Sequence, residues 1–365
     1  MRVYFEASSV LASYNLDLPK AMSSYIDIYV DIKHPLLYAI YLYERFHGRY
    51  GVFKVIPSYI DRFVGTYVIK KADIVHLNSL NVKLAKMAKN LNKPVIAVLH
   101  GAPFPKEAYD AINDYIDVYI APSNFTKIHE EPKIGSKKIV VIYHGIDTEL
   151  FNTNISRETA RRKLGIPLNA KVILWNDRIS PEKDLRTFLQ AAEIIIREVK
   201  EAYIYIKGRA VVKNYYEYLK SDLRTLLNSG RAKLNISWMP HSKLPLLYRA
   251  ADVFVRTSKH ENFGLGAIEA MACNVPVVAP KEATFPEVIA HETLLYKPED
   301  PSNLAEKVII LLNNADLYNS IKEYLLTRVH EYFDVRKIAK KYVELYSMTL
   351  RLHRSGGKYA TGRRY

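Results

Sequence analysis

Short runs of apolar residues alternate with amphipathic segments through the first part of this 365-residue chain. Continuous apolar runs are typical of strands buried on both faces, and the segments between them are typical of covering helices. The pattern therefore predicts a parallel, doubly wound α/β sheet. Its predicted strands are residues 2–5, 26–30, 52–56, 74–77, 95–99, 118–120 and 139–143, and its clearest predicted helices are residues 36–46 and 82–91.

A second alternation of the same kind begins at residue 171. Two Rossmann-like domains are therefore expected, residues 1–150 and residues 151–334, joined through a passage at 148–170. An amphipathic helix is predicted at 335–352, and the basic tail at 353–365 lacks an apolar face and is expected to be mobile. The predicted strands of the second domain are residues 171–175, 203–207, 233–238, 251–255 and 275–279, with helices at 157–164, 185–199, 215–227 and 244–250.

Composition narrows the class of protein. Hydrophobic residues make up 49% of the chain, which argues against disorder, and no apolar run is long enough to span a membrane. The single cysteine, Cys273, excludes an internal disulfide and a cysteine-based metal cluster. A cytoplasmic location is expected. The net charge of +15 favours anionic partners such as nucleic acid, lipid head groups or acidic substrates.

The densest group of candidate functional residues lies at residues 258–279. Glu261 and Glu269 are eight residues apart, and the small loop between them contains Gly264 and Gly266. A strand before the loop, a helix after it and a further strand form a βαβ unit, whose loop lies where α/β proteins bind ligands. Free N–H groups at the helix start suit a phosphate, and the two carboxylates suit sugar and ribose hydroxyls. From this pattern alone, an ordinary βαβ unit with acids facing water remains an alternative.

A second candidate group follows the strand predicted at 171–175. Arg178 and Lys183 are five residues apart across a turn that contains Pro181, so both are expected to point at one anion. A planar guanidinium and a compact ammonium together suit a diphosphate. Asp177 and Asp184 flank the pair, and an acid beside a phosphate is unfavourable unless it points away. A solvated charged turn is the alternative here.

Histidines provide the third group. His100 ends the strand predicted at 95–99 and precedes Gly101, a position where α/β proteins bind ligands. A core histidine that hydrogen-bonds a backbone group is the alternative. His76, at the end of the preceding strand, is a weaker candidate for contacts with an acceptor, and His144 is assigned to the interdomain junction.

The segment with Glu261 and Glu269 resembles the Glu-x7-Glu signature of retaining glycosyltransferases of the GT-B fold, in particular glycosyltransferase family 4 (glycosyl transferases group 1). The resemblance implies two Rossmann-like domains with a cleft between them, and a terminal helix that crosses back to the first domain. Asn262 and Asn274 stand where the family usually has Gly, and Asn tolerates left-handed backbone better than most residues.

The resemblance also implies roles for individual residues. Glu269 would bind the nucleotide ribose, and Glu261 would bind donor sugar hydroxyls. Arg178 and Lys183 would neutralise the donor diphosphate as the glycosidic bond breaks, while His100 would contact a sugar hydroxyl or orient the acceptor. The further donor-binding candidates are Phe263, Gly264 and Leu265 through their backbone, Gly208 in a turn near the nucleotide, and Met239 beside the base.

The implied activity is metal-independent, retaining transfer of a hexose from a UDP- or GDP-linked sugar to a glycan, lipid-linked or other hydroxyl acceptor, with no cofactor. An anionic membrane surface is a further candidate partner; nucleic acid is not expected, because the charge is dispersed. Asp177 and Asp184 replace glycines of the family pattern, and the stretch 6–11 lacks the family's Gly-Gly loop. Two alternatives stay open: a basic nucleic-acid- or membrane-binding protein on a degenerate GT-B fold, and a sugar-nucleotide epimerase.

Overall fold

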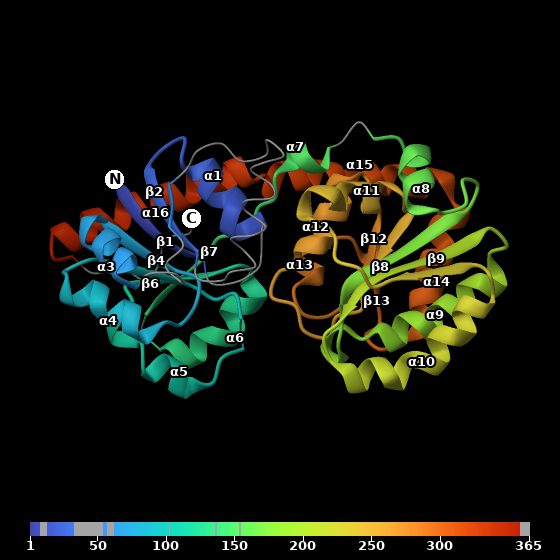
Figure 1. Ribbon diagram of the computed structural model, residues 1–365, viewed down its shortest axis with the longest axis horizontal. Helices are drawn as coiled ribbons and strands as arrows, with labels where there is room; N and C mark the ends of the chain where they lie inside the picture. The colour runs from blue at the N-terminus through green and yellow to red at the C-terminus, as the bar shows by residue number, and fades with distance from the viewer. Residues whose placement is uncertain are drawn as a thin grey trace. The chain divides into compact units, whose positions relative to one another are not determined.

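The computed structural model describes residues 1–7, 13–32, 54–56, 62–101, 103–135, 137–152 and 155–357 (Figure 1). Two compact units divide the chain. The first contains Met1–Asp147 and Tyr332–Tyr365, and the second contains Thr148–Glu331. Both are built on parallel sheets with helices around them, so the predicted doubly wound α/β class is confirmed.

The described strands of the first unit form a seven-stranded sheet in the order β3-β2-β1-β4-β5-β6-β7, and every neighbouring pair is parallel. Buried apolar runs fit such a sheet because both of its faces are covered. The strands are β1 (Arg2–Ala7), β2 (Asp27–Ile32), β3 (Lys54–Ile56), β4 (Ile74–Leu77), β5 (Val95–Val98), β6 (Val118–Ala121) and β7 (Lys138–Val141).

Helices cover both faces of this sheet. They are η1 (Ser13–Asp17), α1 (Leu18–Met22), α3 (Arg62–Lys71), α4 (Val82–Asn90), α5 (Lys106–Asp110), η2 (Asn113–Tyr115), α6 (Asn124–Ile134) and α16 (Val335–Arg354). The helix predicted at 36–46 lies outside the described residues, as do residues 8–11 of the stretch without glycine and residues 358–365 of the basic tail.

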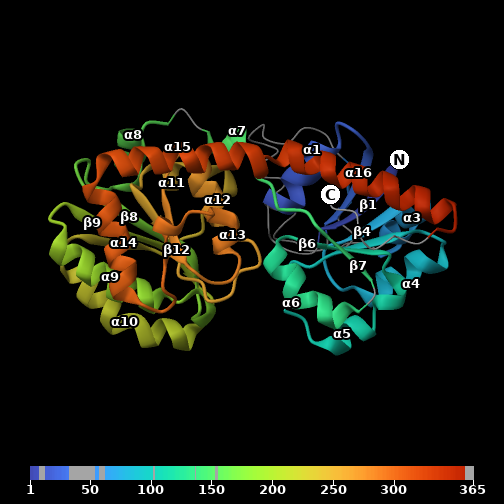
Figure 2. The same cartoon turned by 180° about the vertical axis from the view of Figure 1, so that it is seen from behind.

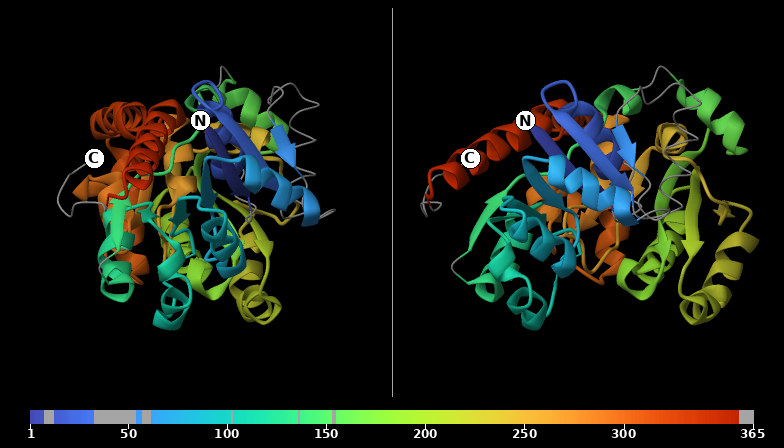
Figure 3. Two further views of the ribbon diagram at one scale, coloured as in Figure 1. Left: turned by 90° about the vertical axis from the view of Figure 1, so that its left-hand side faces the viewer. Right: turned by 60° about the vertical axis from the view of Figure 1, so that its left-hand side comes forward.

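The terminal helix α16 is part of the first unit's core. Its residues Ile338, Tyr342 and Tyr346 are fully buried in one cluster with Val3 and Phe5 of β1. Figure 2 shows this red helix running along the first sheet, and Figure 3 shows it on the opposite side of the strands from the teal helices. η1 and α1 contribute Leu16, Leu18 and Met22 to the same cluster. Because α16 supplies much of this apolar layer, the first unit needs a segment almost 200 residues downstream of its last strand to complete its core.

The second unit has a six-stranded parallel sheet in the order β10-β9-β8-β11-β12-β13. Its strands are β8 (Lys171–Ile179), β9 (Ala202–Ala210), β10 (Ala232–Asn235), β11 (Val253–Val255), β12 (Val277–Pro280) and β13 (Leu295–Tyr296). Its helices are α7 (Thr148–Phe151), α8 (Arg157–Leu164), η3 (Pro181–Lys183), α9 (Leu185–Glu198), α10 (Lys213–Asn228), η4 (His241–Lys243), α11 (Leu244–Arg249), α12 (Leu265–Ala272), α13 (Phe285–Ile289), η5 (Glu292–Leu294), α14 (Pro301–Asn313) and α15 (Ala315–Tyr332).

Two strands of the second unit are longer than predicted, and this corrects the expectation for Gly208. β8 and β9 pair in register through Asp177 and Gly208, so Gly208 lies inside a strand and not in a turn. A Cβ at this position would lie 2.9 Å from Cγ1 of Ile179 and 3.1 Å from the carbonyl oxygen of Asp177. Glycine is therefore required by the close approach of β8.

Each sheet has a point where the strand order reverses. In the first unit it lies between β1 and β4, and in the second between β8 and β11. Ligands of doubly wound folds bind at the carboxyl ends of strands beside such a point. In the part of the chain that the structure describes, no helix combines the length and apolar character needed to cross a bilayer.

Candidate functional site

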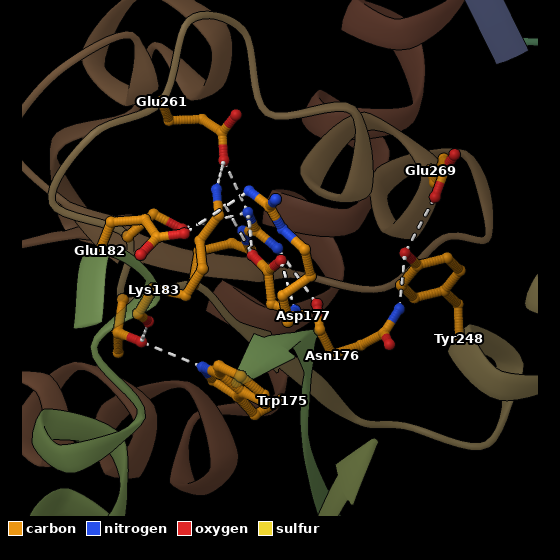
Figure 4. Close-up of polar contacts among 12 residues, drawn as sticks. Trp175, Asn176, Asp177, Glu182, Lys183, Tyr248, Glu261 and Glu269 are labelled. Carbon is orange, nitrogen blue, oxygen red and sulfur yellow. Dashed lines mark hydrogen bonds and ion pairs between the residues drawn. The ribbon is translucent and has the colours of Figure 1, made fainter. Parts of the chain in front are cut away.

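Four charged side chains meet beside the reversal point of the second sheet (Figure 4). Asp177 comes from the end of β8 and Lys183 from η3, which follows directly. Arg256 follows β11, and Glu261 lies in the next loop. β8 and β11 are neighbours in the sheet, which is why residues about 80 positions apart in the sequence converge.

The four side chains alternate in charge and close a ring. Arg256 lies 2.6 Å from Oδ2 of Asp177 and 2.7 Å from Oε2 of Glu261. Nζ of Lys183 lies 2.8 Å from the same Glu261 oxygen and 3.7 Å from Oδ2 of Asp177. Burial by itself would raise the pKa of Glu261, but Lys183 and Arg256 outweigh it and hold that pKa below its usual range. We refer to Asp177, Lys183, Arg256 and Glu261 as the charge ring.

Backbone and side-chain hydrogen bonds fix Lys183 in the ring. Nε1 of Trp175 donates to the hydroxyl of Thr257 at 3.0 Å, and this hydroxyl donates to the carbonyl of Lys183 at 2.8 Å. The amide of Lys259 donates to the carbonyl of Glu182 at 3.0 Å. The turn after β8 is thus tied to the loop after β11, which sets the direction of the lysine side chain.

Asp184 has a structural role where the family pattern usually has glycine. Its φ of 43° is left-handed, a conformation that Asp tolerates better than most residues. Its carboxylate caps α9, accepting from the amide of Thr187 at 3.4 Å and from the Thr187 hydroxyl at 2.7 Å. One of the two unexpected acids is therefore explained as a helix cap.

Arg178 does not join Lys183 in the charge ring. Its side chain is 57% exposed and lies 3.6 Å from Glu182. Successive residues of a strand point to opposite faces, so Asp177 and Arg178 cannot both enter the ring. Arg256, which sequence reasoning missed, is the cation that accompanies Lys183 there.

Glu269 lies on α12 and is held by two groups outside the ring. The hydroxyl of Tyr248 donates to Oε2 at 2.9 Å, and Nε2 of His241 lies 3.2 Å from Oε1. Nδ2 of Asn176 in turn donates to the Tyr248 hydroxyl at 3.4 Å. Figure 4 shows Glu269, Tyr248 and Asn176 as one chain of contacts that leads toward Asp177. These contacts fix the direction of the Glu269 carboxylate, which is buried.

The glycine loop begins α12 as the motif requires. Gly264 caps the helix with φ 82° and ψ 52°, the left-handed conformation that glycine favours. Phe263 is buried, and Leu265 is the first helical residue. Asn274 is left-handed at φ 60°, as its replacement of glycine predicted, whereas Asn262 is not among the described non-glycine residues with positive φ. Met239 lies half-buried between β10 and η4.

A second polar cluster lies at the reversal point of the first sheet. Oδ1 of Asn78 contacts Nε2 of His76 at 2.8 Å and Nε2 of His100 at 3.1 Å. Nδ1 of His76 lies 2.6 Å from the hydroxyl of Tyr346 on α16, and Nδ1 of His100 lies 3.2 Å from Nε2 of His144. The His144 ring stacks on that of His100, and His144 lies three residues before Asp147, where the first part of this unit ends. His76 has no exposed surface and cannot contact an acceptor directly.

The hydrogen bonds of Asn78 determine the tautomers of these histidines. Nδ2 of Asn78 donates to Asn15 and to the carbonyl of Glu6, so Oδ1 faces the histidines as an acceptor. Both Nε2 atoms must then donate, which leaves Nδ1 of His76 to accept from Tyr346. Burial lowers the pKa of His76 to about 3, and burial followed by His144 and His76 lowers the pKa of His100. Both rings are therefore neutral at pH 7.

Glu6, the penultimate residue of β1, fixes the loop after β4. Its carboxylate accepts from the amide of Asn78 at 3.2 Å, the hydroxyl of Ser79 at 2.9 Å and Nδ2 of Asn81 at 3.0 Å. Sequence reasoning missed Glu6, Asn78 and Tyr346, because each carries a signal only through partners far away in the chain. Within the described ranges, no three His, Cys, Asp or Glu side chains are arranged to hold a metal ion.

Two family models match the chain, one on each side of residue 150. Residues 156–327 match the family described as glycosyl transferases group 1, and residues 21–150 match glycosyltransferase family 4. The chain is 30% identical over 220 residues to an uncharacterized glycosyltransferase of Methanocaldococcus jannaschii. It is 32% identical over 247 residues to a D-inositol 3-phosphate glycosyltransferase of Corynebacterium urealyticum. These alignments cover 59% and 64% of this chain but only 55% and 57% of the relatives, so the chain spans little more than half of each.

A solved structure resembles the fold over nearly its whole length. The HepE protein of Anabaena, crystallised with UDP and glucose, has a TM-score of 0.80 at 22% identity. The match covers 95% of this chain and 100% of that one. At this identity the likeness establishes the architecture.

Proposed function

Because the chain belongs to the glycosyltransferases of group 1 and family 4, with the GT-B fold, we propose that it transfers a hexose from a nucleotide-diphosphate sugar to a hydroxyl acceptor. The proposed reaction retains the anomeric configuration and needs no metal ion. UDP- and GDP-linked sugars are the proposed donors, and the crystallisation of HepE with UDP and glucose supports a donor of this class.

The observation that carries the proposal is the asymmetry of Glu261. Its Oε2 accepts from both Lys183 and Arg256, at 2.8 Å and 2.7 Å. Figure 4 shows the other oxygen directed away from these cations, and its side chain is the most exposed of the charge ring, at 18%. One oxygen thus anchors the carboxylate and the other remains to accept from donor sugar hydroxyls.

Positive groups around this carboxylate suit the departing nucleotide. As the glycosidic bond breaks, negative charge develops on the diphosphate, and fixed cations or backbone donors stabilise it. The groups proposed to stabilise this charge are Lys183, the exposed guanidinium of Arg178 and the backbone N–H groups of Phe263, Gly264 and Leu265 at the start of α12. With this charge supplied by the protein, the proposed mechanism has no step that needs a metal.

Glu269 is the proposed ribose ligand. Tyr248 and His241 each engage one of its oxygens, and a carboxylate oxygen has a second lone pair that can accept from a ribose hydroxyl. In the first unit, His100 is the proposed hydrogen-bonding partner of a sugar hydroxyl or of the acceptor. A glycan, a lipid-linked sugar or a smaller hydroxyl compound is the proposed acceptor, and the net charge of +15 favours acceptors or surfaces that carry negative charge.

The family matches favour this function over the alternatives, which are a nucleic-acid- or membrane-binding protein on a degenerate fold and an epimerase. An epimerase would interconvert sugar nucleotides without an acceptor. Donor consumption that depends on an added acceptor therefore separates a transferase from an epimerase.

A thermal-shift panel of UDP-, GDP- and ADP-sugars in EDTA tests the proposal. One nucleotide is expected to stabilise the protein, and Glu269→Ala is expected to remove that stabilisation. Glu193→Ala, which truncates an exposed glutamate of α9, is the matched control and should keep it. With the selected donor, product NMR should show the donor's anomeric configuration, and turnover should survive EDTA. No stabilisation by any sugar nucleotide, or turnover lost in EDTA, contradicts the corresponding part of the proposal.

A further inference from the structure

The charge ring contains its own counter-charges. Two cations, Lys183 and Arg256, face two carboxylates, Asp177 and Glu261, and each cation contacts both acids within 3.7 Å. The side chains are only 7% to 18% exposed, so water screens these interactions poorly. The four charges sum to zero. An approaching anion therefore meets a neutral cluster and not a pair of free cations.

Asp177 is the unusual member of this ring. The family pattern has glycine at its position, so this chain carries one acid more beside the proposed diphosphate site. The structure shows that the acid points into the ring and is held by Arg256 at 2.6 Å, while its distance to Nζ of Lys183 is 3.7 Å. Its Oδ1 accepts from the backbone amide of Arg178 at 2.7 Å. Of its two contacts with the cations of the ring, the longer one is thus to the lysine that is proposed to bind the donor.

We propose that Asp177 competes with the donor diphosphate for Lys183. Asp177 neutralises part of the lysine's positive charge until a bound nucleotide takes over the contact with Lys183. This inference rests on the proposed function. Arg256 keeps Asp177 in place when Lys183 turns to the ligand, so the acid continues to repel the bound diphosphate. A nucleoside diphosphate product carries more negative charge than the nucleotide sugar. Asp177 therefore weakens binding of the product more than binding of the donor, which favours product release.

Removal of this carboxylate is expected to tighten nucleotide binding. In Asp177→Asn the ring gains one net positive charge with little change in shape, and Arg256 remains paired with Glu261. Asp177→Gly restores the residue of the family pattern. It also has no side chain, so it controls for any contact that the Asn side-chain amide makes in the first variant. The matched control is Glu193→Gln, which removes one negative charge from the exposed face of α9 in the same unit.

Isothermal titration calorimetry with UDP and GDP, at low and high salt, tests the inference. We expect Kd to fall roughly 3- to 30-fold in both Asp177 variants at low salt, with a smaller gain at high salt. Glu193→Gln is expected to stay within about twofold of the unchanged protein, because its charge is exposed and screened. Product inhibition in the transfer assay should become stronger in the same two variants.

The outcomes separate this inference from the proposed function. Binding by the unchanged protein without a gain in either Asp177 variant overturns the inference alone. Binding that appears only in the Asp177 variants supports it. No nucleotide binding by any of these proteins overturns both the inference and the proposed function. Melting temperatures of all variants, measured without ligand, show that each one is folded when it is titrated.

Discussion

The hydroxyl of Tyr248 lies 2.9 Å from Oε2 of Glu269, and both side chains are buried. This pair connects α11 to α12 and fixes the glutamate that is proposed to bind ribose. A buried acceptor that loses its donor is destabilising, because neither water nor another group replaces the bond. The proposed donor site therefore depends on a tyrosine that need not touch the ligand.

Tyr248→Phe is expected to weaken nucleotide binding roughly 3- to 10-fold and to destabilise the fold by about 1–3 kcal/mol. Titration calorimetry and urea unfolding measure the two effects. Tyr205→Phe is the matched control, because Tyr205 is equally buried in the same unit and its hydroxyl accepts from Asn235 at 3.3 Å. Equal losses of affinity in both variants would assign the effect to general loosening of the unit and not to Glu269.

Replacing Lys183 and replacing Arg178 are expected to have different effects on the stability of the protein, although both residues are proposed to bind the diphosphate. Lys183→Met leaves Asp177 and Glu261 to share Arg256, which should cost about 3–5 kcal/mol of unfolding free energy. Arg178→Met breaks only an exposed contact with Glu182 and should cost less than about 1 kcal/mol. In Arg178→Met the activation free energy of turnover should nevertheless rise by about 2–4 kcal/mol, so that turnover falls. Unchanged turnover in Arg178→Met would reject its assignment to the diphosphate.

Gly264 is expected to tolerate a side chain less well than Gly230. Both residues are left-handed, at φ 82° and 69°, but a Cβ at Gly264 would lie 3.1 Å from Cε1 of Phe285, whereas nothing lies within 4 Å at Gly230. Gly230→Ala should cost about 1 kcal/mol of backbone strain, and Gly264→Ala about 2–3 kcal/mol. Nucleotide affinity should fall only for Gly264→Ala, because only that change moves the start of α12. If Gly264→Ala and Gly230→Ala change the unfolding free energy and the nucleotide affinity equally, the loop at Gly264 has no special role in nucleotide binding.

The buried histidines predict a loss of stability in mild acid. The pKa of His76 falls from an ordinary value of 6.5 to about 3 on folding, so the unfolded chain binds its proton first. Stability is therefore complete above pH 6.5 and declines as the pH drops from 6.5 toward 3, by up to about 1.4 kcal/mol per pH unit for each such group. Urea unfolding between pH 7.5 and 5 measures this slope.

His76→Gln should make that slope shallower, although it lowers stability at pH 7.5. His129→Gln, at an exposed position of α6, should leave the slope unchanged. If His76→Gln retains the full slope, another group is responsible for the acid sensitivity.

The sequence determined the local features of this protein. Apolar runs indicated the parallel strands of both units, and the family motif located Glu261, Gly264 and Glu269 on one loop and helix. These features depend on residues that lie within about ten positions of one another, so their spacing carries the information. The length of β8 was less predictable, because the polar residues at its end remain in the strand through pairing with β9.

Only the tertiary structure decided which side chains meet. Arg256 has no motif of its own, and its partner Asp177 lies 79 positions earlier in the chain, brought close by the pairing of β8 with β11. Tyr346 reaches His76 because α16 completes the core of the first unit, across 270 positions. Charge and hydrogen-bond energies fall steeply with distance in space but do not depend on separation in sequence. The pattern along the chain therefore identified the elements and the main motif. Sheet order and helix packing decided which residues from distant parts of the chain contact one another.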